Sequence, residues 1–156
     1  MPRFAKGTVG FLAAALIALT VLGLGPLSSD DFSTPPDDLM TDQESPSRLA
    51  VLWTSGDREV ALKVTFMYTL NAKARGWFDE VTLIVWGPSS DLLAADRELQ
   101  DQVKAMGEAG VELVACRACA DSYGVSEDLE ALGIEVKYMG VPLTEMLKGD
   151  WQVLTF

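Results

Sequence analysis

The sequence predicts a three-layer α/β/α domain with a five-stranded, mainly parallel sheet, preceded by an N-terminal transmembrane helix. From residue 48 to residue 156, short apolar runs alternate with amphipathic helical stretches, which favours a parallel sheet with helices on both faces and right-handed crossovers. Residues 81–86 (VTLIVW) are continuously apolar, as expected of a strand that helices cover on both faces. A separate uncharged segment, residues 7–27, precedes this region.

The uncharged segment is long enough to cross a hydrocarbon core of about 30 Å as a helix. Arg3 and Lys6 precede it and no basic residue follows before Arg48, so the positive-inside rule places the rest of the chain on the extracytoplasmic side. Residues 1–27 are therefore a membrane anchor or a signal segment. We favour the uncleaved anchor, because residues 23–26 (GLGP) are a poor cleavage site; secretion after cleavage is the alternative.

Residues 28–47 contain six acidic residues, three prolines and no Lys or Arg, which predicts a solvated tether. Residues 48–156 then form the domain, with 17 acidic and 10 basic residues. This acidity argues against nucleic acid as a partner and against tight adherence to anionic lipid.

The first half of the domain predicts two strands and two helices. Residues 48–54 form a strand, and a helix over residues 58–73 has an apolar stripe wide enough for burial on two sides. The strand at 81–86 ends at Gly87, and Ser90 is a candidate N-cap for the helical stretch that follows.

The second half predicts three further strands. Gly110 closes the preceding helix, and residues 111–115 form a strand that leads directly into Cys116. A turn over residues 117–123 and a short helix from Ser126 precede a strand over residues 134–139. Pro142 is tolerated in the first turn of another helix, and residues 151–156 form the last strand.

Residue types absent from the chain exclude several chemistries. Without histidine there is no Ser-His or Cys-His catalysis and no His-ligated metal. Neither G-x-G-x-x-G nor a P-loop is present, so no cofactor is expected. The segment TSGD at residues 54–57 is a weak anion-binding candidate, and Ser55 or Asp57 is better explained as a helix cap.

Cys116 and Cys119 are the candidate catalytic residues. Ligands of open α/β sheets bind beyond the carboxyl ends of the strands, where Cys116 is expected. A thiol at the start of a helical turn is nearer to being a thiolate, and Cys119 follows one turn later, within reach of a disulfide. Arg117 is a candidate source of positive charge, and Asp121 is near enough in sequence to oppose it.

Other interpretations of the two cysteines remain open. They could be buried and inert, as most unpaired cysteines are, or they could bind metal together with ligands from another chain. Two thiolates suit Cu(I) better than Zn(II). A thiol–disulfide oxidoreductase is a further alternative.

Residues 111–125 resemble the DsrE/DsrF-like family, relatives of the sulfur-relay subunits. In that family a cysteine ends the third strand and Gly-Val follows the short helix, as Cys116 and Gly124-Val125 do here. The closing segment WQVLTF resembles the family's last strand. The resemblance covers residues 48–156, and Cys119 is an addition to the pattern.

The resemblance implies that Cys116 accepts sulfur as a persulfide, between donor and acceptor proteins or small persulfides, with Cys119 assisting. It also implies a homo-oligomer, either a trimer or a hexamer. The hypothesis is thus a membrane-tethered persulfide carrier. The alternative is a non-enzymatic binding or assembly module whose cysteines are structural or bind metal, or else a redox protein.

Overall fold

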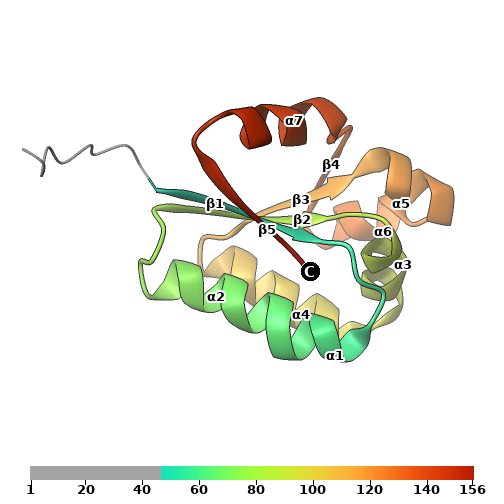
Figure 1. Cartoon of the computed structure of the whole chain (residues 1–156). Helices are drawn as coiled ribbons and strands as arrows, with labels where there is room; N and C mark the ends of the chain where they lie inside the picture. The colour runs from blue at the N-terminus through green and yellow to red at the C-terminus, as the bar shows by residue number, and fades with distance from the viewer. Residues whose placement is uncertain (1–46) are drawn as a thin grey trace, which may run out of the picture. The chain divides into compact units, whose positions relative to one another are not determined.

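All five predicted strands form one sheet in the computed structural model, which describes residues 47–156 (Figure 1). The sheet has the order β4-β3-β2-β1-β5, and every neighbouring pair of strands is parallel. The predicted three-layer α/β fold is confirmed, with a sheet that is parallel throughout. The strands are β1 (Arg48–Trp53), β2 (Glu80–Val85), β3 (Glu112–Cys116), β4 (Glu135–Lys137) and β5 (Trp151–Thr155).

Four helical elements lie below the sheet in Figure 1, and all but the first of them contribute residues to the core on this face. They are α1 (Arg58–Val60), the π-helical turn η2 (Ala61–Thr65), α2 (Phe66–Ala74) and α4 (Arg97–Glu108). Alternate residues of β1, among them Val51 and Trp53, enter this core together with Leu99 and Val103 of α4. Each fully buried side chain of this kind contributes about 1.5–3 kcal/mol to folding.

The opposite face of the sheet is covered by helix α7 (Gly140–Lys148), which lies above the sheet in Figure 1. Leu143 and Met146 of this helix pack on Ile84 and Val114 of the two central strands. No residue of α7 is fully buried, so this layer of the core is thinner than the one below the sheet.

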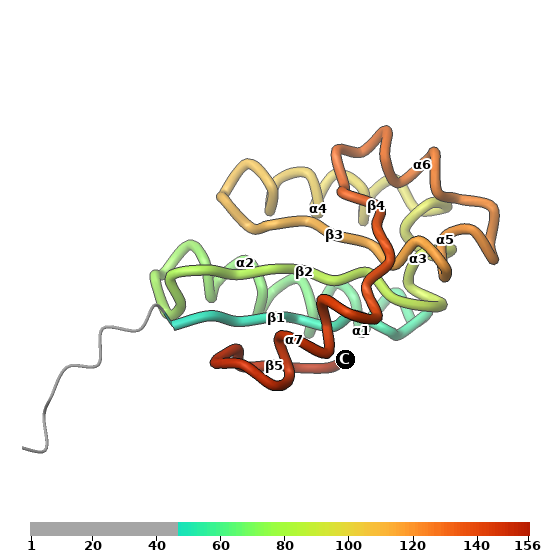
Figure 2. Tube along the Cα trace, turned by 90° about the horizontal axis from the view of Figure 1, so that it is seen from above, coloured from blue at the N-terminus to red at the C-terminus, as the bar shows by residue number. Residues whose placement is uncertain are grey.

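Three short helices lie at the end of the sheet where the strands terminate. They are α3 (Pro88–Ala95), α5 (Arg117–Tyr123) and α6 (Ser126–Ala131). Figure 2 shows α3 and α5 beyond the carboxyl ends of β2 and β3, with α6 alongside β4. Because the strands are parallel, the connections that follow β2, β3 and β4 all begin at the same edge of the sheet. This is the edge at which ligands of open α/β folds bind.

The helix predicted over residues 58–73 is present, but it contains a π-helical turn between α1 and α2. Its inner side is buried at Phe66 and Thr69. Its outer side leaves Val64 39%, Met67 57% and Leu70 37% exposed. The sequence predicted burial of this helix on two sides. Within the described residues, only the side that faces the sheet is buried.

Three details of the predicted elements differ from the structure. Ser90 is not an N-cap: Gly87 caps α3, and Ser90 is buried inside that helix. The stretch predicted as one helix is two, because the Asp96 side chain accepts hydrogen bonds from the N–H groups of Glu98 and Leu99 and starts α4 anew. Strand β4 is also shorter than predicted, because Met139 already caps α7.

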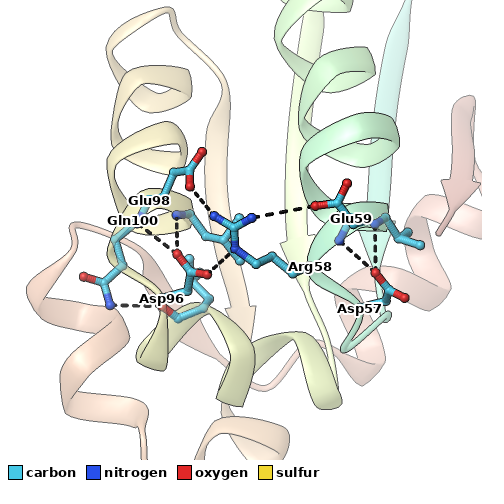
Figure 3. A network of polar contacts seen from close by, with 9 residues as sticks. Asp57, Arg58, Glu59, Asp96, Glu98 and Gln100 are labelled. Carbon is cyan, nitrogen blue, oxygen red and sulfur yellow. Dashed lines mark hydrogen bonds and ion pairs between the residues drawn. The ribbon is translucent and has the colours of Figure 1, made fainter.

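A charged network joins the start of α1 to the start of α4 (Figure 3). The Arg58 Nε donates to Asp96 Oδ2 at 2.7 Å, and the same guanidinium also bonds to Glu98. The Arg58 guanidinium holds the pKa of the Asp96 carboxyl below its usual range, mainly through this hydrogen bond. Asp57 caps α1 beside it, accepting from the Glu59 N–H at 2.8 Å, as the sequence predicted.

The predicted membrane segment, residues 7–27, and all of the tether except residue 47 lie outside the described residues. Within residues 47–156, no helix has the length and apolar character needed to cross a membrane.

Candidate functional site

Cys116 is the last residue of β3, and it is also the N-cap of α5. Its backbone is extended, with φ −72° and ψ 111°, so the chain passes from strand to helix within one residue. Because the sheet is parallel, the ends of β2 and β4 lie on either side of it, and its Cα pairs with that of Lys137. Cys116 therefore lies at the carboxyl edge of the sheet, where the sequence predicted it.

The Cys116 side chain faces the α7 side of the sheet and is 4% exposed. It belongs to a buried apolar cluster with Ile84, Val114 and Met139. Trp86 and Leu143 pack against the rim of this cluster. The sulfur is thus close to the surface at a strand end, but apolar side chains shield it from water.

Cys119 lies one turn into α5, packs against the same cluster and is partly exposed. Both cysteines are free thiols. Burial raises the pKa of the Cys119 thiol, and its hydrogen bond and charge interaction with Cys116 raise this pKa further. The structure therefore brings the two predicted site residues together at one apolar cluster.

The backbone N–H of Gly87 faces the Cys119 sulfur and opposes this effect by lowering its pKa. Gly87 is separated from the end of β2 by Trp86 alone and has φ 71° and ψ −133°, a conformation open to glycine. It links the C-terminal end of β2 to the thiol pair at the end of β3. The sequence placed Gly87 at this edge of the sheet but gave no signal of its contact with Cys119, which depends on how α5 packs against α3.

Ser89 fixes the loop that presents the Gly87 N–H. Its Oγ donates to the Trp53 carbonyl oxygen at 2.6 Å and accepts from the Trp86 N–H at 3.0 Å. Gly56 also lies against this loop, since a Cβ added there would be 3.2 Å from the Pro88 Cβ. The loop that follows β1 and the loop that follows β2 are thus in contact with each other next to the thiols.

The charged residues of α5 are directed toward α6 and β4. Arg117 donates to Glu130 Oε1 at 2.6 Å and to the Val136 carbonyl oxygen at 2.9 Å. Asp121 accepts from Ser126 Oγ at 2.5 Å. The expected influence of Arg117 on the thiols is therefore reduced, because its charge is neutralised by Glu130 on the far side of α5.

Three of the four backbone N–H groups of the segment 54–57, the weak anion-binding candidate, already have partners within the chain. The N–H groups of Thr54 and Ser55 donate to the Phe156 carbonyl oxygen at 2.7 and 3.2 Å, and the Asp57 N–H donates to Ser55 Oγ at 3.1 Å. Among the residues that the structure describes, no group of three or more His, Cys, Asp or Glu side chains is placed to hold a metal ion.

Comparison with known proteins identifies a family that matches this domain. The model of the DsrE/DsrF-like family matches residues 50–156, which include both cysteines and all but the first residues of the sheet. A search of curated proteins found no match.

Two solved structures are similar to the chain. A conserved protein of unknown function from Bacteroides thetaiotaomicron is 37% identical, with a TM-score of 0.68 over 70% of this chain and 95% of that one. The ychN protein of E. coli is 16% identical, with a TM-score of 0.56 over 70% of this chain and 99% of that one. The second likeness concerns the fold alone.

Proposed function

This chain belongs to the DsrE/DsrF-like family, a family generally related to sulfur relay, and we propose that it carries sulfur as a persulfide on Cys116. The observation that supports the proposal most is the thiol at the end of β3, in contact with a second thiol from the first turn of α5. A thiolate is the nucleophile that sulfur transfer requires, and the carboxyl end of a central strand is where α/β folds bind their ligands.

In the proposed reaction the Cys116 thiolate attacks the terminal sulfur of a persulfide or polysulfide donor. The sulfur–sulfur bond of the donor breaks, the donor leaves as a thiolate, and Cys116 gains one sulfur atom. An acceptor thiolate later removes this sulfur by the reverse chemistry. The Cys119 thiol, which lies beside Cys116 in the same apolar cluster, assists, and the apolar side chains around the pair limit access of water to the persulfide.

Incubation of the full chain with inorganic polysulfide tests the proposal directly. We expect intact-protein mass spectrometry at the earliest times after mixing to show one added sulfur atom per chain, removable by a small thiol. Failure to gain sulfur from several donors, together with tight binding of Cu(I) by the cysteine pair, would favour the alternative of a metal-binding module.

We also propose that residues 7–27 anchor the chain in a membrane, with the domain on the extracytoplasmic side. The full chain is then expected to fractionate with membranes, and deletion of residues 1–27 to release a soluble, folded domain. Fractionation followed by circular dichroism of the released domain measures both. A shortened protein found free in the extracytoplasmic compartment would show cleavage instead, and a C-terminal reporter active in the cytoplasm would contradict the orientation.

The outer side of α2 supports a proposal of self-association. Met67 and Trp77 are 57% and 51% exposed and line a shallow pocket of about 290 Å³ with Arg75. A trimer or hexamer would bury this apolar surface. We expect light scattering to give such a mass for the wild type, and Met67→Lys to shift it toward the monomer.

Leu147→Lys on α7 serves as the matched control, because Leu147 is 62% exposed on a different helix. It should leave the oligomer intact. A monomeric wild type at micromolar concentration would refute self-association, and dissociation by Leu147→Lys alone would place the interface on α7.

A further inference from the structure

We propose that the sulfur carried on Cys116 is released within the chain as hydrosulfide, when Cys119 displaces it and forms a Cys116–Cys119 disulfide. This inference rests on the proposed function of Cys116 and assigns to Cys119 a reaction of its own. The chain would then be a reductase of persulfides as well as a carrier of them.

The contact between the two thiols determines which sulfur atom Cys119 can attack. Cys116 ends the strand and Cys119 lies three residues later, so both side chains lie on one side of the first turn of α5. They interact directly and share one apolar cluster. A sulfur atom added to Cys116 lies beyond the Cys116 Sγ, so the nearer target of Cys119 is the inner sulfur.

Attack on the inner sulfur gives a balanced reaction. The Cys119 thiolate forms a bond to the Cys116 Sγ, the bond between this sulfur and the outer sulfur breaks, and the outer sulfur leaves with the bonding pair as hydrosulfide. The proton of Cys119 passes to solvent or to the leaving hydrosulfide. In this step the Cys119 sulfur is oxidised to the disulfide level that the Cys116 sulfur already has in the persulfide, and the outer sulfur is reduced to sulfide.

The surroundings of Cys119 fit a thiol that reacts in a second step. Burial and the Cys116 contact raise its pKa, which favours the protonated thiol, and Cys119 lies one turn beyond the strand-end thiol that is loaded first in this proposal. The Gly87 N–H, which the bonds of Ser89 hold in place, is available to stabilise the Cys119 thiolate as it forms. A single-thiol carrier has no use for this arrangement.

A second turnover requires reduction of the disulfide by a dithiol, which supplies two electrons and two protons and is itself oxidised to a disulfide. The inference therefore names three participants by chemical class: a persulfide or polysulfide as the sulfur source, hydrosulfide as the product and a dithiol as the reductant.

A single-turnover experiment on the full chain tests the inference. The reduced protein is loaded with inorganic polysulfide, desalted, and followed without added thiol by a hydrosulfide assay and by intact mass. We expect one hydrosulfide to be released per chain. The final protein should have lost the added sulfur and should be lighter than the reduced starting protein by two hydrogen atoms. Cys119→Ser should gain sulfur but release it about 100-fold more slowly, because the intramolecular nucleophile is lost.

A matched control keeps two thiols but separates them. Ser122 lies in the same helix and is exposed, so the double variant Cys119→Ser with Ser122→Cys retains the thiol count without the contact. It should behave like Cys119→Ser.

The possible outcomes separate the inference from the proposed function. A stable persulfide on the wild-type chain, with no hydrosulfide released, would overturn the inference and leave the carrier function intact. Disulfides between chains, or rapid release by the double variant, would also overturn it. Failure of the wild type to take up sulfur would overturn both.

Discussion

Substitution of Cys116 by serine is expected to reduce sulfur loading to the level of a blank without protein. Serine has nearly the same shape, but its hydroxyl is neither ionised at neutral pH nor nucleophilic toward a sulfur–sulfur bond. Intact-protein mass spectrometry after incubation with polysulfide measures the loss. Cys119→Ser should load normally, because the strand-end thiol remains.

A second variant excludes failure to fold as the cause. Cys116 is 4% exposed, so a serine hydroxyl there costs about 1–3 kcal/mol if it finds no hydrogen-bond partner. Cys116→Ala avoids this penalty and should be equally inactive with an unchanged circular dichroism spectrum. Loading of the folded Cys116→Ala protein at the wild-type level would show that another residue accepts the sulfur.

Substitution of Trp53 by alanine is expected to lower the free energy of unfolding by about 3–5 kcal/mol. Trp53 ends β1 and is fully buried, and its ring meets that of Phe66 edge to face at a centroid distance of 4.9 Å. Its removal opens a cavity in the core below the sheet, directly under the loops that support the thiols. Urea unfolding followed by circular dichroism measures the loss.

Trp53→Phe is the informative comparison. The buried indole N–H of Trp53 has no hydrogen-bond partner, so phenylalanine removes an unsatisfied donor and keeps most of the contact with Phe66. We expect a loss below about 1.5 kcal/mol. A phenylalanine variant as unstable as the alanine variant would mean that the indole N–H stabilises the fold, contrary to the structure.

The sheet and the position of Cys116 could be predicted because their signals are local. A continuous apolar run identifies β2, and the apolar residues 113–115 that lead into Cys116 identify β3. Alternation of strands with helices then implies that the strand ends share one edge.

Other features depend on contacts between segments distant in sequence. The π-helical turn from Ala61 to Thr65 has no distinctive residue pattern, and Ser90 has the composition of a cap although its environment is the helix interior. The contact of Gly87 with Cys119 joins two crossovers that start from adjacent strands, so it follows from packing. Arg117 turns toward Glu130 for the same reason.

The most direct test of the carrier function is to locate the added sulfur. Wild-type protein loaded with polysulfide is alkylated at once, digested and sequenced by tandem mass spectrometry, so that a persulfide and a plain thiol give different labels. We predict the persulfide on Cys116 and the plain label on Cys119 in the molecules that have not yet released sulfur. A persulfide found on Cys119, with Cys116 unmodified, would contradict the assignment of Cys116 as the sulfur acceptor.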